Sequence, residues 1–170
     1  MNVESASKVP PVRGRAAYGF TLLELLITAV LLGILAAIAI PSYSAYVARG
    51  HRSAAKAALM QSAQFLERNY TAVGCYDHTV ACTGASAVAV TVPVPFAPSD
   101  GGTITYVLSL TAVASQTYTL AAIPCGTAGS CPGGSNSTFT DECGTLSLDN
   151  TGAKTVSGGT NTNPAACWGR

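Results

Sequence analysis

The stretch Gly19-Phe20-Thr21-Leu22-Leu23-Glu24 opens an apolar run that continues to Ile40. Glu24 is the only charged residue in this run, and about 20 apolar residues are enough for a helix to cross the hydrocarbon core of a bilayer. A carboxylate at membrane depth costs at least ~2.5 kcal/mol unless another group pairs with it. The run therefore predicts a membrane-spanning helix, and Glu24 is a candidate functional residue that needs a partner.

The residues before Glu24 suggest that partner. If the chain is cut between Gly19 and Phe20, a new α-amino group arises at Phe20, four residues before the carboxylate. Within one helix the two groups lie one turn apart, and between neighbouring helices shifted by a turn they could meet directly. An ammonium group beside a carboxylate in low dielectric makes the buried charge tolerable.

These residues resemble the signature of type IV pilins: Gly-Phe-Thr-Leu-Leu-Glu at 19–24, an apolar run containing Gly33, and Ala-Ile-Pro-Ser-Tyr at 39–43. In that family a membrane prepilin peptidase cuts after the Gly and methylates the new N-terminal Phe. The resemblance implies cleavage after Gly19 and N-methylation of Phe20. An ordinary signal peptide, cleaved near Ala36-Ala37-Ile38-Ala39, is the alternative, but it explains neither Glu24 nor the helical pattern that follows.

We expect four segments: a leader peptide at 1–19, a transmembrane or filament-core helix at 20–40, an amphipathic helix half at 41–74 and a disulfide-stapled β head at 75–170. The leader carries Lys8, Arg13 and Arg15, which should stay in the cytoplasm by the positive-inside rule. The predicted location is therefore the cytoplasmic membrane, as a single-pass precursor with its head outside the cytoplasm, and then an extracellular filament.

One long helix, kinked at Pro41, is expected from about Thr21 to Tyr70, because helix formers resume after Ser42. One face of its second half is apolar, at Leu59, Ala63, Leu66 and Tyr70, and Gly74 is the first strong stop signal. Gly33 and Pro41 bracket a weak section of the helix. In the resembled family this section can lose helical structure in the filament, although a routine transmembrane Gly and a Pro kink explain it equally well.

The head should be an antiparallel sheet of about four strands, wrapped on the second half of the helix in an α+β fold. The best strands are expected at Ile104–Thr111 and Gln116–Ile123. Thr145–Asp149 and Ala153–Val156 flank Asn150-Thr151-Gly152, which is expected to form a hairpin turn. The segment 87–95 alternates Val with small residues, but two prolines restrict it to an edge or an extended segment.

All six cysteines lie in the head, which indicates an oxidising compartment, and they permit 15 pairings. The sequential set is preferred because Cys75–Cys82 and Cys125–Cys131 would close short, turn-rich loops. The third pair, Cys143–Cys167, also fits the resembled family, in which a C-terminal pair bounds a loop facing outward from the filament. The segment from Cys143 to Gly152, together with Cys167-Trp168, is most similar to PilE-like minor pilins.

The sequence shows no catalytic constellation, and we predict no enzyme activity, no cofactor and no metal site. His51 and His78 stand alone, and Asp141 and Glu142 are expected to form a solvated turn beside Cys143. Arg49, His51, Arg52 and Lys56 are expected to form a solvated helix face near lipid headgroups.

The resemblance implies a structural subunit of a type IV pilus, a minor pilin that supports adhesion, twitching motility or DNA uptake. Its partners would be other pilin subunits, the prepilin peptidase and methyltransferase, the inner-membrane assembly platform and, before assembly, the bilayer. Glu24 would set the axial register against a neighbouring Phe20 amine. The alternatives are a pilin that displays a receptor surface for DNA or a host ligand, and a type II secretion pseudopilin. Direct nucleic-acid binding is disfavoured, because beyond residue 70 only Lys154 and Arg170 are cationic.

Overall fold

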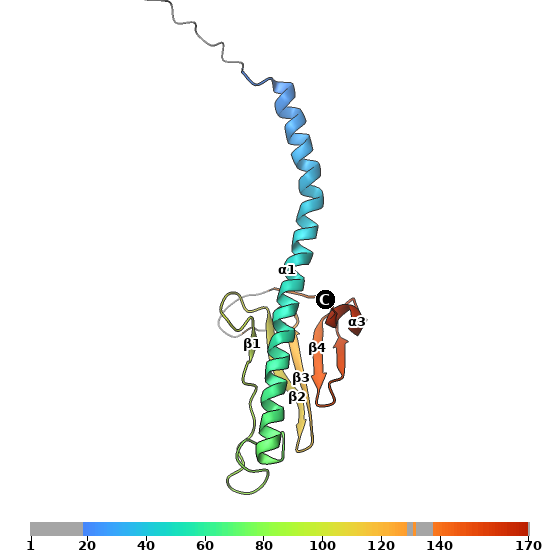
Figure 1. Ribbon diagram of the computed structural model, residues 1–170. Helices are drawn as coiled ribbons and strands as arrows, with labels where there is room; N and C mark the ends of the chain where they lie inside the picture. The colour runs from blue at the N-terminus through green and yellow to red at the C-terminus, as the bar shows by residue number, and fades with distance from the viewer. Residues whose placement is uncertain (1–18, 129–130, 132–137, 170) are drawn as a thin grey trace, which may run out of the picture. The chain divides into compact units, whose positions relative to one another are not determined.

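The protein was analysed as a computed structural model, which describes residues 19–128, 131 and 138–169 (Figure 1). The predicted leader therefore lies outside the described residues except for Gly19. The chain divides into two compact units between Ser42 and Tyr43. The elements follow in the order α1 (Leu22–Val73), β1 (Phe96–Ala97), β2 (Tyr106–Ala114), β3 (Thr117–Pro124), α2 (Cys125–Ala128), β4 (Thr145–Asp149), β5 (Lys154–Ser157) and α3 (Pro164–Trp168).

The helix α1 begins one residue after the predicted start and ends three residues beyond the predicted Tyr70, directly before the stop signal at Gly74. Thr21 caps its N-terminus, since its hydroxyl accepts a hydrogen bond from the backbone N–H of Glu24 at 3.2 Å. At the other end, the N–H of Gly74 donates to the carbonyl of Tyr70 at 2.8 Å, and the φ of Gly74 is +91°. Glycine adopts this left-handed backbone without strain, which is why the helix stops here.

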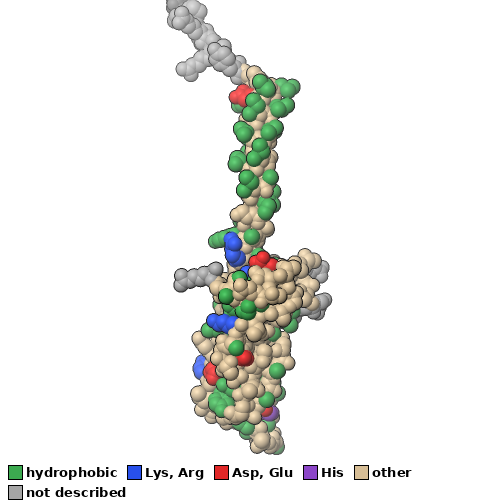
Figure 2. Space-filling model, turned by 90° about the vertical axis from the view of Figure 1, so that its right-hand side faces the viewer, with side chains coloured by type: hydrophobic (Ala, Val, Ile, Leu, Met, Phe, Trp, Pro, Cys, Tyr) green, Lys and Arg blue, Asp and Glu red, His purple; other side chains and the backbone are tan. Residues whose placement is uncertain are grey.

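In the first unit, every side chain of α1 is exposed. Among the described residues α1 is the one helix long and apolar enough to cross a membrane, by length and composition. Figure 2 shows hydrophobic side chains along this stretch, whereas the charged side chains gather mainly over the head. A helix that is apolar all round needs lipid or other helices to cover it.

In the second unit, one face of α1 is buried. Leu59, Ala63 and Leu66 lie on it as predicted, and Tyr70 is half-buried beside the core. The face begins with Arg52, of which only 6% is exposed. The expectation that Arg52 belongs to a solvated helix face is therefore wrong, because the side chain is enclosed by the head and paired there.

The sheet is an antiparallel meander in the order β1-β2-β3-β4-β5. Four of its strands coincide closely with the predicted ones, and the α+β fold is confirmed. The fifth strand, β1, was not predicted because it has only two residues, Phe96 and Ala97, which pair with Val107 and Tyr106. The proline-containing segment before it forms no strand of the sheet, apart from a single bridge between Ala89 and His78.

The core of the head lies between α1 and the sheet. Leu59 and Leu66 from the helix belong to the same buried cluster as Leu120 and Leu146 from β3 and β4. A head of this size has a limited core, and covalent links supplement it. The structure contains three disulfides, Cys75–Cys82, Cys125–Cys131 and Cys143–Cys167.

Two glycines allow the backbone to pack closely where β4 begins. A Cβ at Gly144, whose φ is +61°, would lie 2.3 Å from the carbonyl oxygen of Ser157, and a Cβ at Gly159 would lie 2.2 Å from that of Glu142. The segment 142–144 therefore lies directly against 157–159, with no room for a side chain between them.

We expect Gly144→Ala to destabilise the head by about 2–4 kcal/mol, since the new methyl group meets fixed backbone and φ is left-handed. Gly152→Ala is the matched control: its φ is +80°, but nothing lies within 4 Å of the added Cβ. It should cost only the backbone strain, about 1 kcal/mol. Denaturant unfolding of both variants measures the difference, and equal losses would contradict the close approach at Gly144.

Candidate functional site

The first candidate region is the start of α1. Gly19 and Phe20 lie just before the Thr21 cap of the helix and are exposed, Phe20 at 76%. Glu24 occupies the third helical position after the Thr21 cap, where a carboxylate interacts favourably with the helix dipole. This stabilisation within one chain adds to the predicted role of Glu24 as a partner for a neighbouring Phe20 amine. The role in register and the processing at Gly19 and Phe20 both remain predictions.

Gly33 and Pro41 both lie inside α1, which is helical through each of them. A Cβ at Gly33 would meet nothing within 4 Å, so packing within this chain does not require glycine there. The predicted loss of helix between the two residues concerns the assembled filament and remains a prediction.

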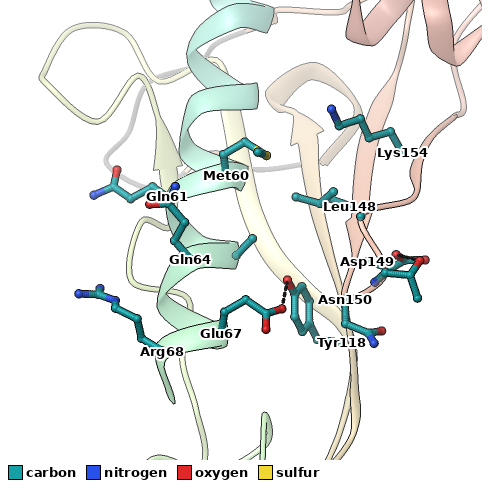
Figure 3. A pocket seen from close by; sticks show the side chains of 13 residues that line it. Met60, Gln61, Gln64, Glu67, Arg68, Tyr118, Leu148, Asp149, Asn150 and Lys154 are labelled. Atoms are coloured by element: carbon teal, nitrogen blue, oxygen red, sulfur yellow. Dashed lines mark hydrogen bonds between the residues drawn. The ribbon is translucent and has the colours of Figure 1, made fainter. Parts of the chain in front are cut away.

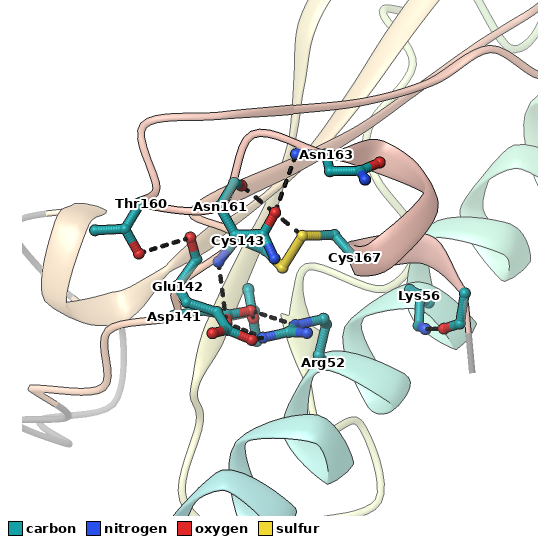
Figure 4. Close-up of polar contacts among 11 residues, drawn as sticks. Arg52, Lys56, Asp141, Glu142, Cys143, Thr160, Asn161, Asn163 and Cys167 are labelled. Atoms are coloured by element: carbon teal, nitrogen blue, oxygen red, sulfur yellow. Dashed lines mark hydrogen bonds and ion pairs between the residues drawn. A yellow bond between two sulfur atoms is a disulfide. The ribbon is translucent and has the colours of Figure 1, made fainter.

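The second candidate region is a buried polar cluster beneath the C-terminal loop, residues 158–163 between β5 and α3 (Figure 4). The Nε of Arg52 donates to Oδ2 of Asp141 at 2.8 Å, and its terminal nitrogen contacts the other oxygen of the same carboxylate. The Tyr106 hydroxyl also donates to Asp141, and the N–H of Cys143 does so at 3.3 Å. Asp141 is thus buried and fully hydrogen-bonded, and the expectation of a solvated turn holds for exposed Glu142 only.

The pKa values in this cluster follow from burial and pairing. Burial acts to raise the pKa of Asp141, but hydrogen bonds from Arg52 and Tyr106 outweigh it and hold the pKa below its usual value. Burial, reinforced by the Asp141 carboxylate, raises the pKa of Tyr106. Asp141 is therefore ionised and Tyr106 neutral at physiological pH. Such a cluster positions the backbone and offers no group ready for proton transfer.

A small cationic surface lies next to this cluster, at the helix α3. Asn163 caps α3, and Cys167 links the helix to Cys143. Lys56 of α1 donates to the carbonyl oxygen of Gly169 at 2.8 Å, and Lys154 of β5 lies 5.5 Å from the ring centroid of Trp168. We call Lys56, Lys154 and Trp168 the Lys–Trp cluster.

Two further cationic side chains, Arg49 and Arg52, lie close to the Lys–Trp cluster. Burial, followed by repulsion from Arg52 and Lys154, lowers the pKa of Lys56. A cavity of about 240 Å³ opens beside Lys56, and Arg49 and Ser53 also line it. The cations come from α1 and β5, which are far apart in the sequence. From the sequence, Lys56 is assigned to a helix face near lipid headgroups and cations for DNA binding are counted only beyond residue 70, so sequence reasoning does not bring Lys56 and Lys154 together.

A larger groove of about 900 Å³ lies between α1 and the β4–β5 hairpin (Figure 3). Met60 and Leu148 form its apolar part, and Glu67 accepts hydrogen bonds from the hydroxyls of Tyr118, at 3.2 Å, and Tyr76, at 3.0 Å. Burial and the Glu67 carboxylate raise the pKa of Tyr76 to about 12. These polar groups satisfy one another's hydrogen-bonding capacity, and their arrangement holds the C-terminal end of α1 to the sheet.

Two groups of side chains in the described residues have the spacing of metal ligands. One consists of Cys75, Asp77 and His78, and the other of Asp141, Glu142 and Cys143. Each contains a cysteine that is part of a disulfide, which removes its thiolate as a ligand. Neither group therefore supplies three metal ligands.

Comparison with known proteins matches both halves of the chain. The family model described as "Type IV minor pilin ComP, DNA uptake sequence receptor" matches residues 41–147, and that of the prokaryotic N-terminal methylation motif matches residues 14–40. A solved type IV pilin from Shewanella oneidensis is 29% identical, covers 63% of this chain and 89% of its own, and has a TM-score of 0.37. The non-core minor pilin PilV of Neisseria meningitidis is 18% identical, with coverages of 70% and 95% and a TM-score of 0.42.

Breaking the buried pair should cost far more than removing its exposed neighbour. We expect Arg52→Met or Asp141→Asn to destabilise the head by about 3–5 kcal/mol, because each leaves a buried polar group without its partner. Glu142→Gln, whose side chain is 60% exposed, should change stability by less than about 1 kcal/mol. Urea unfolding of the three variants measures these differences.

The same pair makes the free energy of unfolding of the head depend on pH in the acid range. The folded-state pKa of Asp141 is below its ordinary value of 3.8, so the unfolded chain takes up this proton at a higher pH than the folded chain. The contribution is complete above the ordinary pKa and is lost as the pH falls through the folded value. Asp141→Asn should therefore lose part of the acid dependence of unfolding, and an unchanged pH profile would contradict this role.

Proposed function

This chain belongs to the type IV minor pilin ComP family, and from this premise we propose that it is cut after Gly19, N-methylated at Phe20 and assembled into a pilus through α1. The two family matches confirm the resemblance to type IV pilins and the prediction of a minor pilin, which is a structural subunit. Processing by the prepilin peptidase and delivery to the inner-membrane assembly platform are parts of the proposal.

The observation that carries the proposal is the first half of α1. Its side chains are exposed on every face, from Leu22 at 81% to Ile40 at 69%, and Glu24 is the only charge among them. Lipid would cover this surface in the precursor, and neighbouring α1 helices would cover it in the filament. One carboxylate within an apolar seam can fix the axial register of helices, because only one offset satisfies it.

The membrane helix, together with the basic leader, supports a precursor held in the cytoplasmic membrane with its head outside. The three disulfides fit this orientation, because such bonds persist in oxidising compartments. Other pilin subunits are the partners that assembly requires. The filament then carries the head to the cell exterior.

A second candidate function is DNA binding by the head, and the description of the matching family model favours it. The Lys–Trp cluster supports this candidate, because cations that meet phosphates supply much of the affinity of DNA-binding surfaces. Lys56 precedes residue 70 in the chain but lies near Lys154 in the fold, so the low cation count beyond residue 70 understates the local charge. This cluster would therefore contact the phosphate backbone of DNA.

We expect Glu24→Ala to separate processing from assembly. Mass spectrometry of the wild-type protein in sheared filaments should find a chain beginning at N-methylated Phe20. The variant should be processed in the same way in the membrane fraction but be strongly depleted from the sheared fraction, because the helix register is lost. Thr28→Ala is a matched polar control within the same helix and should assemble normally. A chain beginning near Ile40 would overturn the proposed function, and normal assembly of Glu24→Ala would overturn the role of Glu24.

For the DNA candidate, we expect Lys154→Gln to weaken binding of the detergent-solubilised mature protein to duplex DNA. Loss of one phosphate contact should reduce the slope of log K against log salt by about 0.9. Arg68→Gln removes an equal charge from α1, outside the Lys–Trp cluster, and is the control. Fluorescence anisotropy titrations across a range of salt concentrations measure both, and equal slopes for the two variants would exclude the Lys–Trp cluster as the contact.

A further inference from the structure

A short part of α1 belongs neither to the apolar run nor to the core of the head. It extends from Pro41 to Gly50, and the first side chain buried by the head is Arg52. Within this part Tyr43 and Tyr46 are 71% and 69% exposed, and Arg49 follows three residues later, also exposed. The three residues share one face of the helix because they are spaced by three. We call them the Tyr–Arg collar.

The chemistry of the collar is that of a membrane–water interface. Tyrosine has an apolar ring and a polar tip, and it is enriched where lipid tails meet headgroups. In the part of the chain that the structure describes, neither phenol hydroxyl has a hydrogen-bond partner within the protein. The guanidinium of Arg49 completes the pattern, since a guanidinium pairs with the phosphate of a lipid headgroup in either leaflet.

The position of the collar along the helix agrees with this chemistry. At 1.5 Å per residue, the run from Phe20 to Ile40 is about 30 Å long, which equals the thickness of the hydrocarbon core. Tyr43 and Tyr46 follow Ile40 by three and six residues in the sequence, so they come within the first two helical turns after the end of the run. If the run fills the core, the tyrosines reach the headgroup layer.

We propose that the Tyr–Arg collar is a lipid-binding surface that holds the precursor at a fixed depth in the headgroups of the outer leaflet. This inference rests on the proposed function, because it requires α1 to span the membrane before assembly. The phenol hydroxyls hydrogen-bond to phosphate and glycerol oxygens, and Arg49 pairs with phosphate. The collar sets how far the helix must move when the subunit leaves the bilayer.

Fluorescence quenching in vesicles tests the collar on the full-length precursor. In a Trp168→Phe background, which removes the only native tryptophan, single reporters are introduced as Tyr43→Trp, Tyr46→Trp, Ile34→Trp and Val113→Trp. Each protein is reconstituted in phosphatidylethanolamine and phosphatidylglycerol vesicles with nitroxide labels either on the headgroup or at mid-chain. Val113, 42% exposed on β2, is the reporter in the head.

We expect the collar reporters to lose more emission to the headgroup label than to the mid-chain label, and Ile34→Trp to show the reverse. Val113→Trp should lose little emission to either label. If mid-chain labels leave Ile34→Trp unquenched, membrane storage of the precursor fails, and the proposed function fails with it. If Ile34→Trp is quenched at mid-chain while the collar reporters are not quenched by headgroup labels, only the inference about the collar fails.

A second measurement separates lipid from a second copy of the chain as the occupant of the collar. The same quenching is recorded as the protein-to-lipid ratio is raised. Quenching of Tyr46→Trp that stays constant supports contact with lipid. A progressive loss of quenching would mean that another subunit covers the collar, and would overturn the proposal.

Discussion

The buried ion pair between Arg52 and Asp141 is the contact on which the arrangement of the head depends. A carboxylate removed from water needs donors on both oxygens, and Asp141 obtains them from the guanidinium of Arg52, the Tyr106 hydroxyl and the N–H of Cys143. These donors come from α1, from β2 and from the residues leading into β4. The pair thereby fixes the position at which the chain enters β4.

The C-terminal loop is fixed in turn by this contact. Cys143 is bonded to Cys167, and the backbone N–H of Asn161 donates to the carbonyl of Glu142 at 2.7 Å. Gly144 and Gly159 allow the two backbones to touch. Four consecutive residues are therefore held in place. Asp141 forms the ion pair, Cys143 forms the disulfide, and the backbones of Glu142 and Gly144 pack against residues 157–159. Together these interactions fix the conformation of a loop that consists of polar and small residues and buries little apolar surface.

Much of the fold can be predicted from local patterns in the sequence. Leu59, Ala63 and Leu66 reveal the buried face of α1 by their spacing, and the β4–β5 hairpin is predicted by Asn150-Thr151-Gly152. The strand β1 could not be predicted, because two residues show no periodicity. Likewise, nothing local marks Arg52 and Asp141 as a buried pair, since 89 residues separate them. The Lys–Trp cluster also arises only in three dimensions, where α1, β5 and α3 bring their side chains together.

The position of the cysteines has a mechanical consequence. All three disulfides join residues that follow α1 in the chain, and none of the six cysteines lies on the helix. The contact between the helix and the sheet is therefore entirely non-covalent. When a pulling force is applied along α1, the disulfides keep the loops of the head closed, while the load passes in shear through the Leu59–Leu66 face and the Arg52–Asp141 pair. Tensile strength at this joint is therefore set by side-chain packing, and reducing agents would loosen the loops without cutting the load path.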